Sequence, residues 1–301
     1  MIIYSLFSMF ILLFSGYVAK RLRIISANKA IVFLDFVLWF ALPSLIFDKV
    51  YHLVVDLNLI SMVFVGLISS VIAAFVAVVM GFMLKFSTAT LASIALLSMF
   101  GNTLFIGIPI VQGLYGQSAL SIVILFDQVV TALPISIFGP LILGFGTSQK
   151  SSIIQNSLKI IKFPPFIALA LAVILKNFNL PEIIFEPLKM LSSSMVPVAL
   201  FAVGLRLGFN SIKSSYKACS VVIFAKMILA PIVFLSITKI FGIELSKEWI
   251  IGLIEVATPP MVLASAMILK ANLDSNLAIS SVAIGMITIF ITMPILYFVA
   301  T

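Results

Sequence analysis

Charged residues are scarce in this chain of 301 residues, of which Asp, Glu, Lys and Arg make up 9%. Soluble domains carry roughly 25% charged residues, and a mean hydropathy of +1.31 with 63% hydrophobic residues excludes a soluble globular domain. Cysteine and histidine are nearly absent: the single Cys219 excludes an internal disulfide, and the single His52 excludes a histidine-rich metal site. The composition therefore predicts an integral membrane protein with no metal or cofactor.

Acidic residues are also few, 10 against 18 Lys and Arg, which gives a formal charge of +8. In a soluble protein this excess would indicate a nucleic-acid partner, whereas in a membrane protein it follows from the enrichment of Lys and Arg in cytoplasmic loops. We therefore expect membrane lipid, and no nucleic acid, around this chain. The basic cluster Lys20, Arg21 and Arg23 follows the first apolar run, which is the reverse order of a signal peptide, so the first helix is expected to be retained.

Apolar runs follow one another along the whole chain. A spanning helix needs about 20 mostly apolar residues, so at roughly 30 residues per pass the chain has room for about ten spans and little else. The runs cover residues 2–20, 30–47, 57–84, 90–114, 119–145, 164–176, 187–207, 216–241, 247–270 and 276–300. This pattern predicts an all-α integral membrane protein with ten transmembrane helices.

The charges of the connecting loops predict an orientation in the membrane. Of the 18 Lys and Arg residues, 12 fall in one set of alternate loops and five in the other set, where acidic residues offset them. Because cytoplasmic loops collect Lys and Arg, the first set is expected inside the cell. We therefore predict a multi-pass protein of the cell membrane with both termini outside and the polar linker 147–162 in the cytoplasm.

The two halves of the chain resemble each other weakly. The second predicted helix contains WFALPSLIF (39–47) and the seventh contains SMVPVALF (194–201), and their prolines lie 154 residues apart, about half the chain. Five helices followed by five that start on the opposite side of the membrane form an inverted repeat, the plan of many secondary transporters. We predict a first repeat over 1–146 and a second over 163–301, joined by the linker within one membrane domain.

Glycine and proline gather in the fourth and ninth predicted helices. The segment 101–116 reads GNTLFIGIPIVQGLYG and the segment 257–261 reads ATPPM, and proline cannot donate a backbone hydrogen bond. An opened helix at membrane depth is tolerated inside protein or beside a water-filled cavity, and two such helices at matching repeat positions indicate a transport site. We expect the fourth helix to open near Pro109 and the ninth at the paired prolines.

Opened half-helices offer free N–H groups and a positive dipole end, which suit a carboxylate. The alternative interpretation is that these residues only permit kinks and close helix packing. On the transport interpretation, the predicted substrate-binding residues are Asn102, Thr103, Gly107, Pro109, Thr258, Pro259 and Pro260.

Several segments resemble the auxin efflux carrier family of bacteria, archaea and plants. GNTLFIGIP (101–109) followed by GLYG (113–116) resembles the fourth-helix motif of that family, and residues 258–294 are similar to its last two helices; FALPSLIF (40–47) and KMILAP (226–231) also match. The resemblance implies ten helices with crossed, broken helices four and nine, and an elevator-like movement. It also implies a homodimer that exports or exchanges small organic anions such as auxin, malate or malonate. The linker of about 17 residues departs from the long regulated loop of the plant carriers.

Four ionisable side chains lie within the predicted spans: Asp35, Asp127, Lys226 and Glu255. An ion in the bilayer core costs at least about 2.5 to 3.5 kcal/mol, so each of them needs a partner, water or neutralisation. Asp35 lies near the cytoplasmic end of its helix and is expected to pair with Lys29 or Lys20. Asp127, Lys226 and Glu255 lie deeper, and we expect them either to exchange a coupling ion or to form a fixed structural pair.

The sequence favours a secondary active transporter of small organic anions over two other classes. An enzyme is not expected, because the chain has neither an H-E-x-x-H motif nor an Asp-rich motif that could hold magnesium. A channel also uses broken helices, and unitary conductance in place of saturable flux would identify one. Proton coupling, sodium coupling and uniport remain open alternatives.

Overall fold

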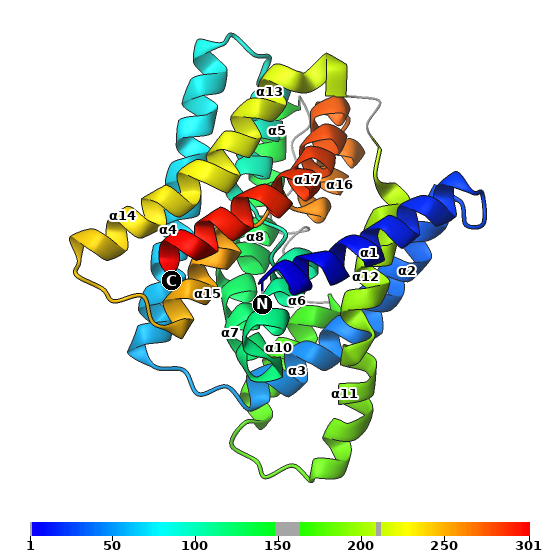
Figure 1. Cartoon of the computed structure of the whole chain (residues 1–301), viewed down its shortest axis with the longest axis vertical. Helices are drawn as coiled ribbons and strands as arrows, with labels where there is room; N and C mark the ends of the chain where they lie inside the picture. The colour runs from blue at the N-terminus through cyan, green and yellow to red at the C-terminus, as the bar shows by residue number, and fades with distance from the viewer. Residues whose placement is uncertain (1, 148–162, 209–211) are drawn as a thin grey trace. The chain divides into compact units, whose positions relative to one another are not determined.

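The computed structural model describes residues 2–147, 163–208 and 212–301 (Figure 1). Within these residues the regular structure is helical, and the one extended pairing is an isolated antiparallel bridge between Gly101 and Pro260. The linker predicted at 147–162 falls almost wholly outside the described residues. The prediction of an all-α protein is confirmed.

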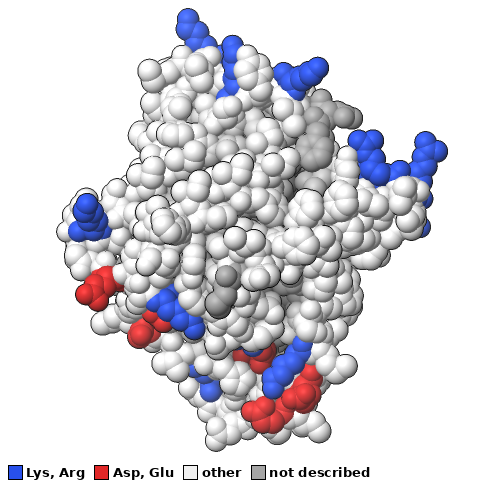
Figure 2. Space-filling view, viewed as in Figure 1, with Lys and Arg blue, Asp and Glu red and all other residues white. Residues whose placement is uncertain are grey.

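Among the described residues, seven helical stretches are long and apolar enough to cross a membrane: Ile2–Arg21, Ala27–Tyr51, Leu57–Met83, Gln117–Gly146, Glu182–Arg206, Ile212–Ile240 and Ser275–Ala300. Shorter apolar helices cover Thr88–Met99, Thr103–Tyr115 and Pro164–Leu175. Large apolar side chains such as Phe75 and Phe298 are exposed, and most of the face shown in Figure 2 is uncharged. These features are those of a multi-pass membrane protein, whereas the count of ten spans stays a prediction.

The chain forms two compact units, and each contains segments from both halves of the sequence. Unit 1 comprises Met1–Val55, Ile108–Leu125 and Ser157–Leu207, and unit 2 comprises Asp56–Gly107, Phe126–Asn156 and Gly208–Thr301. The chain passes from one unit to the other within the fourth and the fifth predicted helices. The packing units therefore do not coincide with the repeats predicted from the sequence.

Unit 1 contains most of α7 (Leu120–Phe126), and its other helices are α1 (Ile2–Arg21), α2 (Ala30–Phe36), α3 (Leu42–Tyr51), α6 (Ile108–Tyr115), α10 (Pro164–Leu175), α11 (Phe185–Ser193) and α12 (Met195–Arg206). Helix α1 packs along α12, and α3 packs against α10 and α11. Gly16 and Gly204 permit the first contact, because a Cβ on either would overlap with a backbone carbonyl of the facing helix. Small residues at such contacts let membrane helices approach closely.

Unit 2 contains α4 (Leu57–Met83), α5 (Thr88–Met99), α8 (Leu133–Gly146), α13 (Ile212–Phe224), α14 (Ala230–Ile240), α15 (Lys247–Val256), α16 (Val262–Lys270) and α17 (Ser275–Ala300). Its apolar core includes Leu97, Val222 and Ile268. Asp274 caps α17 by accepting from the N–H of Leu277 at 3.0 Å, and it also accepts from the Thr90 hydroxyl at 2.9 Å. This side chain therefore ties the start of α17 to the start of α5.

Four π-helical segments occur in the described part of the chain, and each ends two residues before a proline. They are η2 (Val37–Ala41) before Pro43, η3 (Thr103–Gly107) before Pro109, η5 (Asp127–Ala132) before Pro134, and η7 (Ala225–Leu229) before Pro231. A proline removes one i to i−4 hydrogen bond and its ring clashes with the carbonyl four residues earlier, and a widened turn relieves both effects. Three predicted site residues lie at the beginning of such segments: Thr103, Asp127 and Lys226.

Candidate functional site: two broken helices in unit 2

The fourth predicted helix breaks after α5, where Phe100 is extended with φ −104° and ψ 120°. The helix restarts as the π-segment η3, and Asn102 accepts from the N–H groups of Ile106 and Gly107 at 3.1 and 3.4 Å. The first N–H groups of a helix have no acceptor within it. The restart therefore directs the N–H groups of Thr103 and its neighbours toward the break.

The ninth predicted helix breaks between α15 and α16, where Thr258, Pro259 and Pro260 connect the two halves. The hydroxyl of Thr258 donates to the carbonyl of Glu255 at 2.7 Å and closes the end of α15. Two consecutive prolines cannot donate backbone hydrogen bonds, so a helix cannot continue through them. The break predicted at this position is confirmed.

The two breaks cross each other and satisfy each other's backbone. The N–H of Asn102 donates to the carbonyl of Pro259 at 2.8 Å, and the N–H of Met261 donates to the carbonyl of Phe100 at 3.0 Å. These two bonds flank the bridge between Gly101 and Pro260. The crossing is a short antiparallel pairing inside an otherwise helical protein, and it uses two of the N–H groups that the sequence predicted to be free.

The predicted opening near Pro109 is wrong by several residues. The break lies at Phe100–Asn102, and Pro109 is the second residue of α6, directly after the π-turn. A single proline is tolerated there for two reasons. The π-segment widens the helix before it, and the backbone N–H that proline lacks has no acceptor within the first turn of a helix. Pro109 belongs to unit 1, whereas the other six predicted substrate residues belong to unit 2.

Two glycines shape the crossing. A Cβ on Gly101 would overlap with the hydroxyl of Thr258 and press on the end of the Lys226 side chain, and a Cβ on Gly107 would overlap with the carboxylate of Glu255. Gly107 was among the predicted residues, whereas Gly101 was not assigned a role although it stands in the same motif. At both positions a polar side chain lies directly against the backbone of the glycine. Any residue with a Cβ would overlap with that side chain.

Asp127 is fully buried and begins the π-segment η5. Its Oδ1 accepts from the hydroxyl of Thr103 at 2.5 Å, and its Oδ2 accepts from the amide Nε2 of Gln128 at 2.9 Å. Both carboxylate oxygens are thus satisfied, and the pair joins the fifth predicted helix to the restart of the fourth. Gln128 was not among the predicted site residues. Its position directly after Asp127, an acid predicted to lie within the membrane, could have identified it.

Lys226 is 1% exposed, and its Nζ donates to the carbonyl of Val256 at the end of α15. The ammonium therefore occupies the C-terminal end of a helix, where carbonyl groups and the helix dipole stabilise a cation. The sequence predicted an acid as its partner. No ion pair found in the described ranges involves Lys226, and its hydrogen bond goes to backbone.

Glu255 is also fully buried, and neither of its carboxylate oxygens has a hydrogen-bond partner among the described residues. Asp127 and Lys226 are the charged groups that act on it electrostatically. Besides Oγ of Ser98 in α5, two further polar atoms of unit 2 are buried without a partner among the described residues, namely Nδ2 of Asn102 and Oε1 of Gln128. Because an unpaired buried polar group costs about 1 to 3 kcal/mol, these four atoms mark a place where a ligand or an ion would be stabilised.

The structure therefore places nine of the ten predicted site residues in unit 2, whereas Pro109 belongs to unit 1. Asp35, which was expected to pair with Lys29 or Lys20, is exposed and forms none of the ion pairs found in the described part of the chain. The assembled site combines one unpartnered amide donor, two carboxyl groups and one ammonium. It can hold a small anion beside the Asn102 amide and a cation or proton at Glu255.

Known proteins agree with a transport role. Residues 1–297 match the family described as Membrane transport protein. An uncharacterized transporter of Methanocaldococcus jannaschii is 26% identical over 290 residues, which cover 91% of this chain and 91% of that protein. An uncharacterized transporter of Methanothermobacter thermautotrophicus is 23% identical over 296 residues, which cover 97% and 96%. The chain therefore belongs to the membrane transport protein family and is a transporter rather than an enzyme, which confirms its resemblance to the auxin efflux carriers.

Proposed function

We propose that this protein is a secondary active transporter of small organic anions, such as auxin-like monocarboxylates, malate or malonate. The observation that carries the proposal is the crossing of two broken helices beside the unpartnered amide of Asn102. Broken helices at membrane depth are the usual place where a transporter binds its substrate. The amide and the first N–H groups of η3 are donors that suit a carboxylate.

We further propose an elevator-type movement, in which unit 2 carries the substrate and unit 1 stays in place. The residues of the crossing and the three charged residues Asp127, Lys226 and Glu255 belong to unit 2, so the site could move as one body. The described chain passes between the units at four points: 55/56, 107/108, 125/126 and 207/208. Two of these lie beside π-segments, where helices bend. A homodimer, as the resemblance implies, would anchor unit 1.

Replacing Asn102 by alanine is expected to weaken substrate binding about tenfold or more, because a hydrogen bond to a charged group contributes about 1.5 to 3 kcal/mol. The measurement is counterflow of labelled monocarboxylates and dicarboxylates in proteoliposomes. Asn276→Ala, at an exposed position of the same unit, is the matched control and should behave as wild type. Unchanged affinity in a folded Asn102→Ala protein would place the site elsewhere.

The proposed topology has ten spans as a 5+5 inverted repeat, with both termini outside and the linker in the cytoplasm. In a Cys219→Ser background, a cysteine at Ser151 should react with an impermeant thiol reagent from the inside. A cysteine at Glu182, which is 81% exposed, should react from the outside. Reaction of both positions from the same side would reject this arrangement.

A sodium-coupled organic anion symporter is the second candidate. Glu255, Thr258 and backbone carbonyls at the break are oxygen groups that could hold sodium. Imposing pH and sodium gradients separately in the same proteoliposomes distinguishes the two kinds of coupling. A channel would instead show unitary conductance without saturable, gradient-coupled flux.

A further inference from the structure

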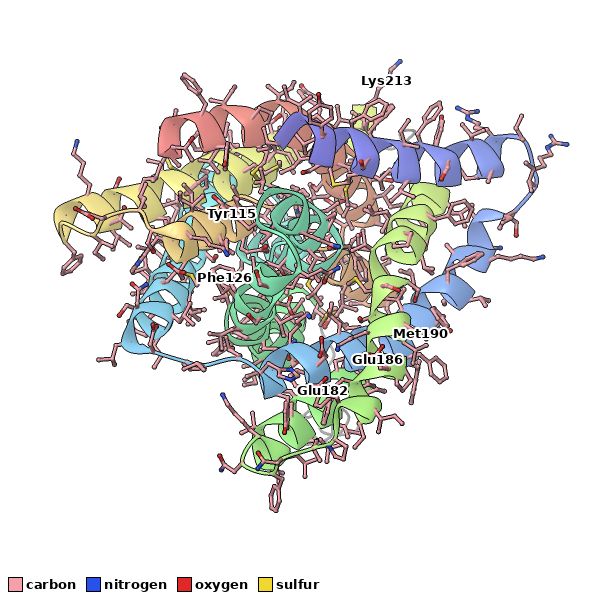
Figure 3. All side chains as sticks on the ribbon, turned by 60° about the horizontal axis from the view of Figure 1, so that its bottom comes forward. Tyr115, Phe126, Glu182, Glu186, Met190 and Lys213 are labelled. Atoms are coloured by element: carbon pink, nitrogen blue, oxygen red, sulfur yellow. The ribbon has the colours of Figure 1, made fainter. Side chains whose placement is uncertain are left out.

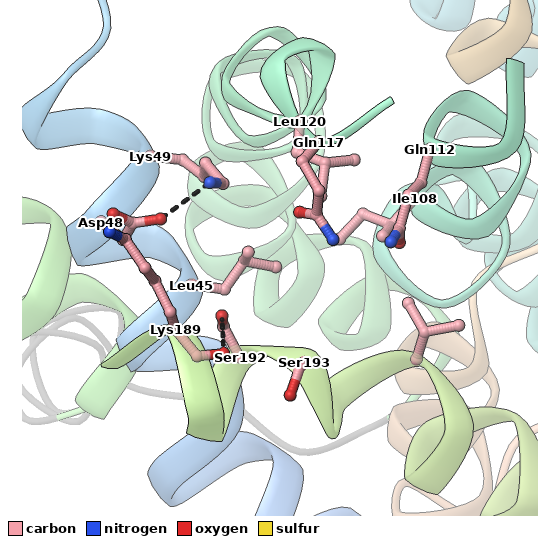
Figure 4. A pocket seen from close by; sticks show the side chains of 11 residues that line it. Leu45, Asp48, Lys49, Ile108, Gln112, Gln117, Leu120, Lys189, Ser192 and Ser193 are labelled. Carbon is pink, nitrogen blue, oxygen red and sulfur yellow. Dashed lines mark hydrogen bonds and ion pairs between the residues drawn. The ribbon is translucent and has the colours of Figure 1, made fainter. Parts of the chain in front are cut away.

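Unit 1 contains a cavity of about 370 Å³, whose lining includes none of the crossing residues of unit 2 (Figure 4). Three groups of elements form its walls: α3, the stretch from α6 through η4 (Gln117–Ala119) to α7, and the consecutive helices α11 and α12. All of its lining residues belong to unit 1. Its volume is in the range of small-molecule sites, which extends upward from about 300 Å³.

Seven of the eleven residues that line this cavity are polar, although the chain as a whole is strongly apolar. The polar residues that line it are Asp48, Lys49, Gln112, Gln117, Lys189, Ser192 and Ser193. Gln112 is the one amide side chain of α6, whose sequence is IPIVQGLY. Polar groups within membrane helices are costly, and they face a cavity or a ligand when they are retained.

The charges of the cavity leave a surplus of positive charge. Asp48 is 2% exposed and pairs with Lys49 at 2.7 Å, so these two groups compensate each other. Among the described residues, Lys189 forms ion pairs with Glu186 at 3.4 Å and Glu182 at 3.8 Å, whose side chains are 69% and 81% exposed, and Asp48 acts on it electrostatically. Glu182 begins the 3-10 segment η6 (Glu182–Ile184) and Glu186 lies in the first turn of α11; both are labelled in Figure 3. Such exposed pairs contribute about 0 to 1 kcal/mol, which leaves the ammonium of Lys189 available to a ligand.

Two amides stand on the wall opposite α11. The side chains of Gln112 and Gln117 point toward each other in Figure 4, and neither makes a hydrogen bond within the described ranges. Each amide can donate two hydrogen bonds. Apolar side chains, among them Leu45, Ile108 and Leu120, complete the wall.

We propose that this cavity of unit 1 is a second binding site, which takes a small amphipathic carboxylate. Its carboxylate group would lie between the ammonium of Lys189 and the amides of Gln112 and Gln117, and its apolar part would lie against Leu45 and Ile108. The proposal rests on the proposed function in one respect: the carboxylate is the transported anion, held on unit 1 before or after it occupies the crossing. Helix α6, which carries Ile108 and Gln112, directly follows the η3 segment of the crossing in the chain.

The test measures protection of lysines from an amine-acetylating reagent in the purified full-length protein, by mass spectrometry of each lysine. The probes are phenylacetate and malonate, with benzyl alcohol as the uncharged control. At a saturating concentration, phenylacetate should lower the acetylation of Lys189 by about threefold or more. The exposed Lys239 of α14 should react as before, and benzyl alcohol should protect neither lysine.

Two variants separate this site from the crossing. Gln112→Leu should reduce the protection of Lys189 by phenylacetate, whereas Asn102→Ala should leave that protection intact. The opposite pattern would assign the carboxylate to the crossing and overturn the second site. Absence of protection by both carboxylates also overturns it, and counterflow of the same compounds would then show that the proposed transport function stands without it. Protection of Lys189 without any flux would support the second site and refute the proposed function.

Discussion

Replacing Lys226 by methionine is expected to lower the melting temperature of the detergent-solubilised protein by roughly 10 °C. Within the described part of the chain, Lys226 is the one base that acts on Glu255, and its ammonium also donates to the last carbonyl of α15. Removing it leaves two fully buried acids, Asp127 and Glu255, without a cation. Breaking a buried charge arrangement in this way costs about 3 to 5 kcal/mol, which corresponds to the expected shift.

The measurement is thermal unfolding in detergent, and Lys239→Met is its matched control because Lys239 is exposed on the adjacent helix α14. The control should unfold within a degree or so of wild type, since an exposed substitution changes stability by about 0.5 kcal/mol or less. Adding Glu255→Gln to Lys226→Met should restore part of the lost stability, because it removes one of the stranded acids. Equal stability of Lys226→Met and Lys239→Met would show that the ammonium does not balance these charges.

Some of the fold was predictable because a strong local rule decided it. The break of the ninth helix was correctly placed, since two consecutive prolines remove two donors at once and no helical turn can absorb both. The break of the fourth helix was misplaced because a single proline, Pro109, is absorbed by a π-turn. The backbone instead opens at Phe100, directly before Gly101 and Asn102, which permit a break but do not enforce one as a proline pair does.

The two packing units could not be predicted from the pattern of apolar residues. Hydropathy identifies which segments enter the membrane, but it does not say which helix packs against which. The contact of α1 with α12 depends on Gly16 and Gly204, which lie 188 residues apart in the chain. Prediction of the buried charges was more successful, because the cost of an ion at membrane depth singles out Asp127, Lys226 and Glu255 one by one.

The cavity of unit 1 was missed for a related reason. Gln112, Lys189 and Asp48 come from three separate elements, and each is unremarkable near the end of its own helix. Lys189 was counted among the loop charges that set the predicted orientation. Only the packing of α3 against α11 shows that these side chains line one space.

Replacing Glu255 by glutamine is expected to abolish the response of flux to an imposed proton gradient while substrate counterflow continues. Both oxygens of Glu255 are buried without a hydrogen-bond partner, whereas Asp127 already accepts from Thr103 and Gln128. When all three groups are ionised, Asp127 and Glu255 carry two negative charges against the one positive charge of Lys226. A single proton on Glu255 removes this excess of one negative charge. Gly107 lies directly against this carboxylate, where a Cβ would overlap with it.

Glutamine has nearly the shape of a protonated glutamate but cannot release a proton, so the variant should bind and exchange substrate without coupling. The measurement is uptake of a labelled carboxylate into proteoliposomes, with pH and sodium gradients imposed separately and counterflow recorded in the same preparation. Glu186→Gln, whose side chain is 69% exposed in the wild type, is the control and should keep the gradient response. Loss of the sodium response alone would identify sodium as the coupling ion. If Glu255→Gln still concentrates substrate with the gradient dependence of wild type, Glu255 has a structural role and the coupling ion binds elsewhere.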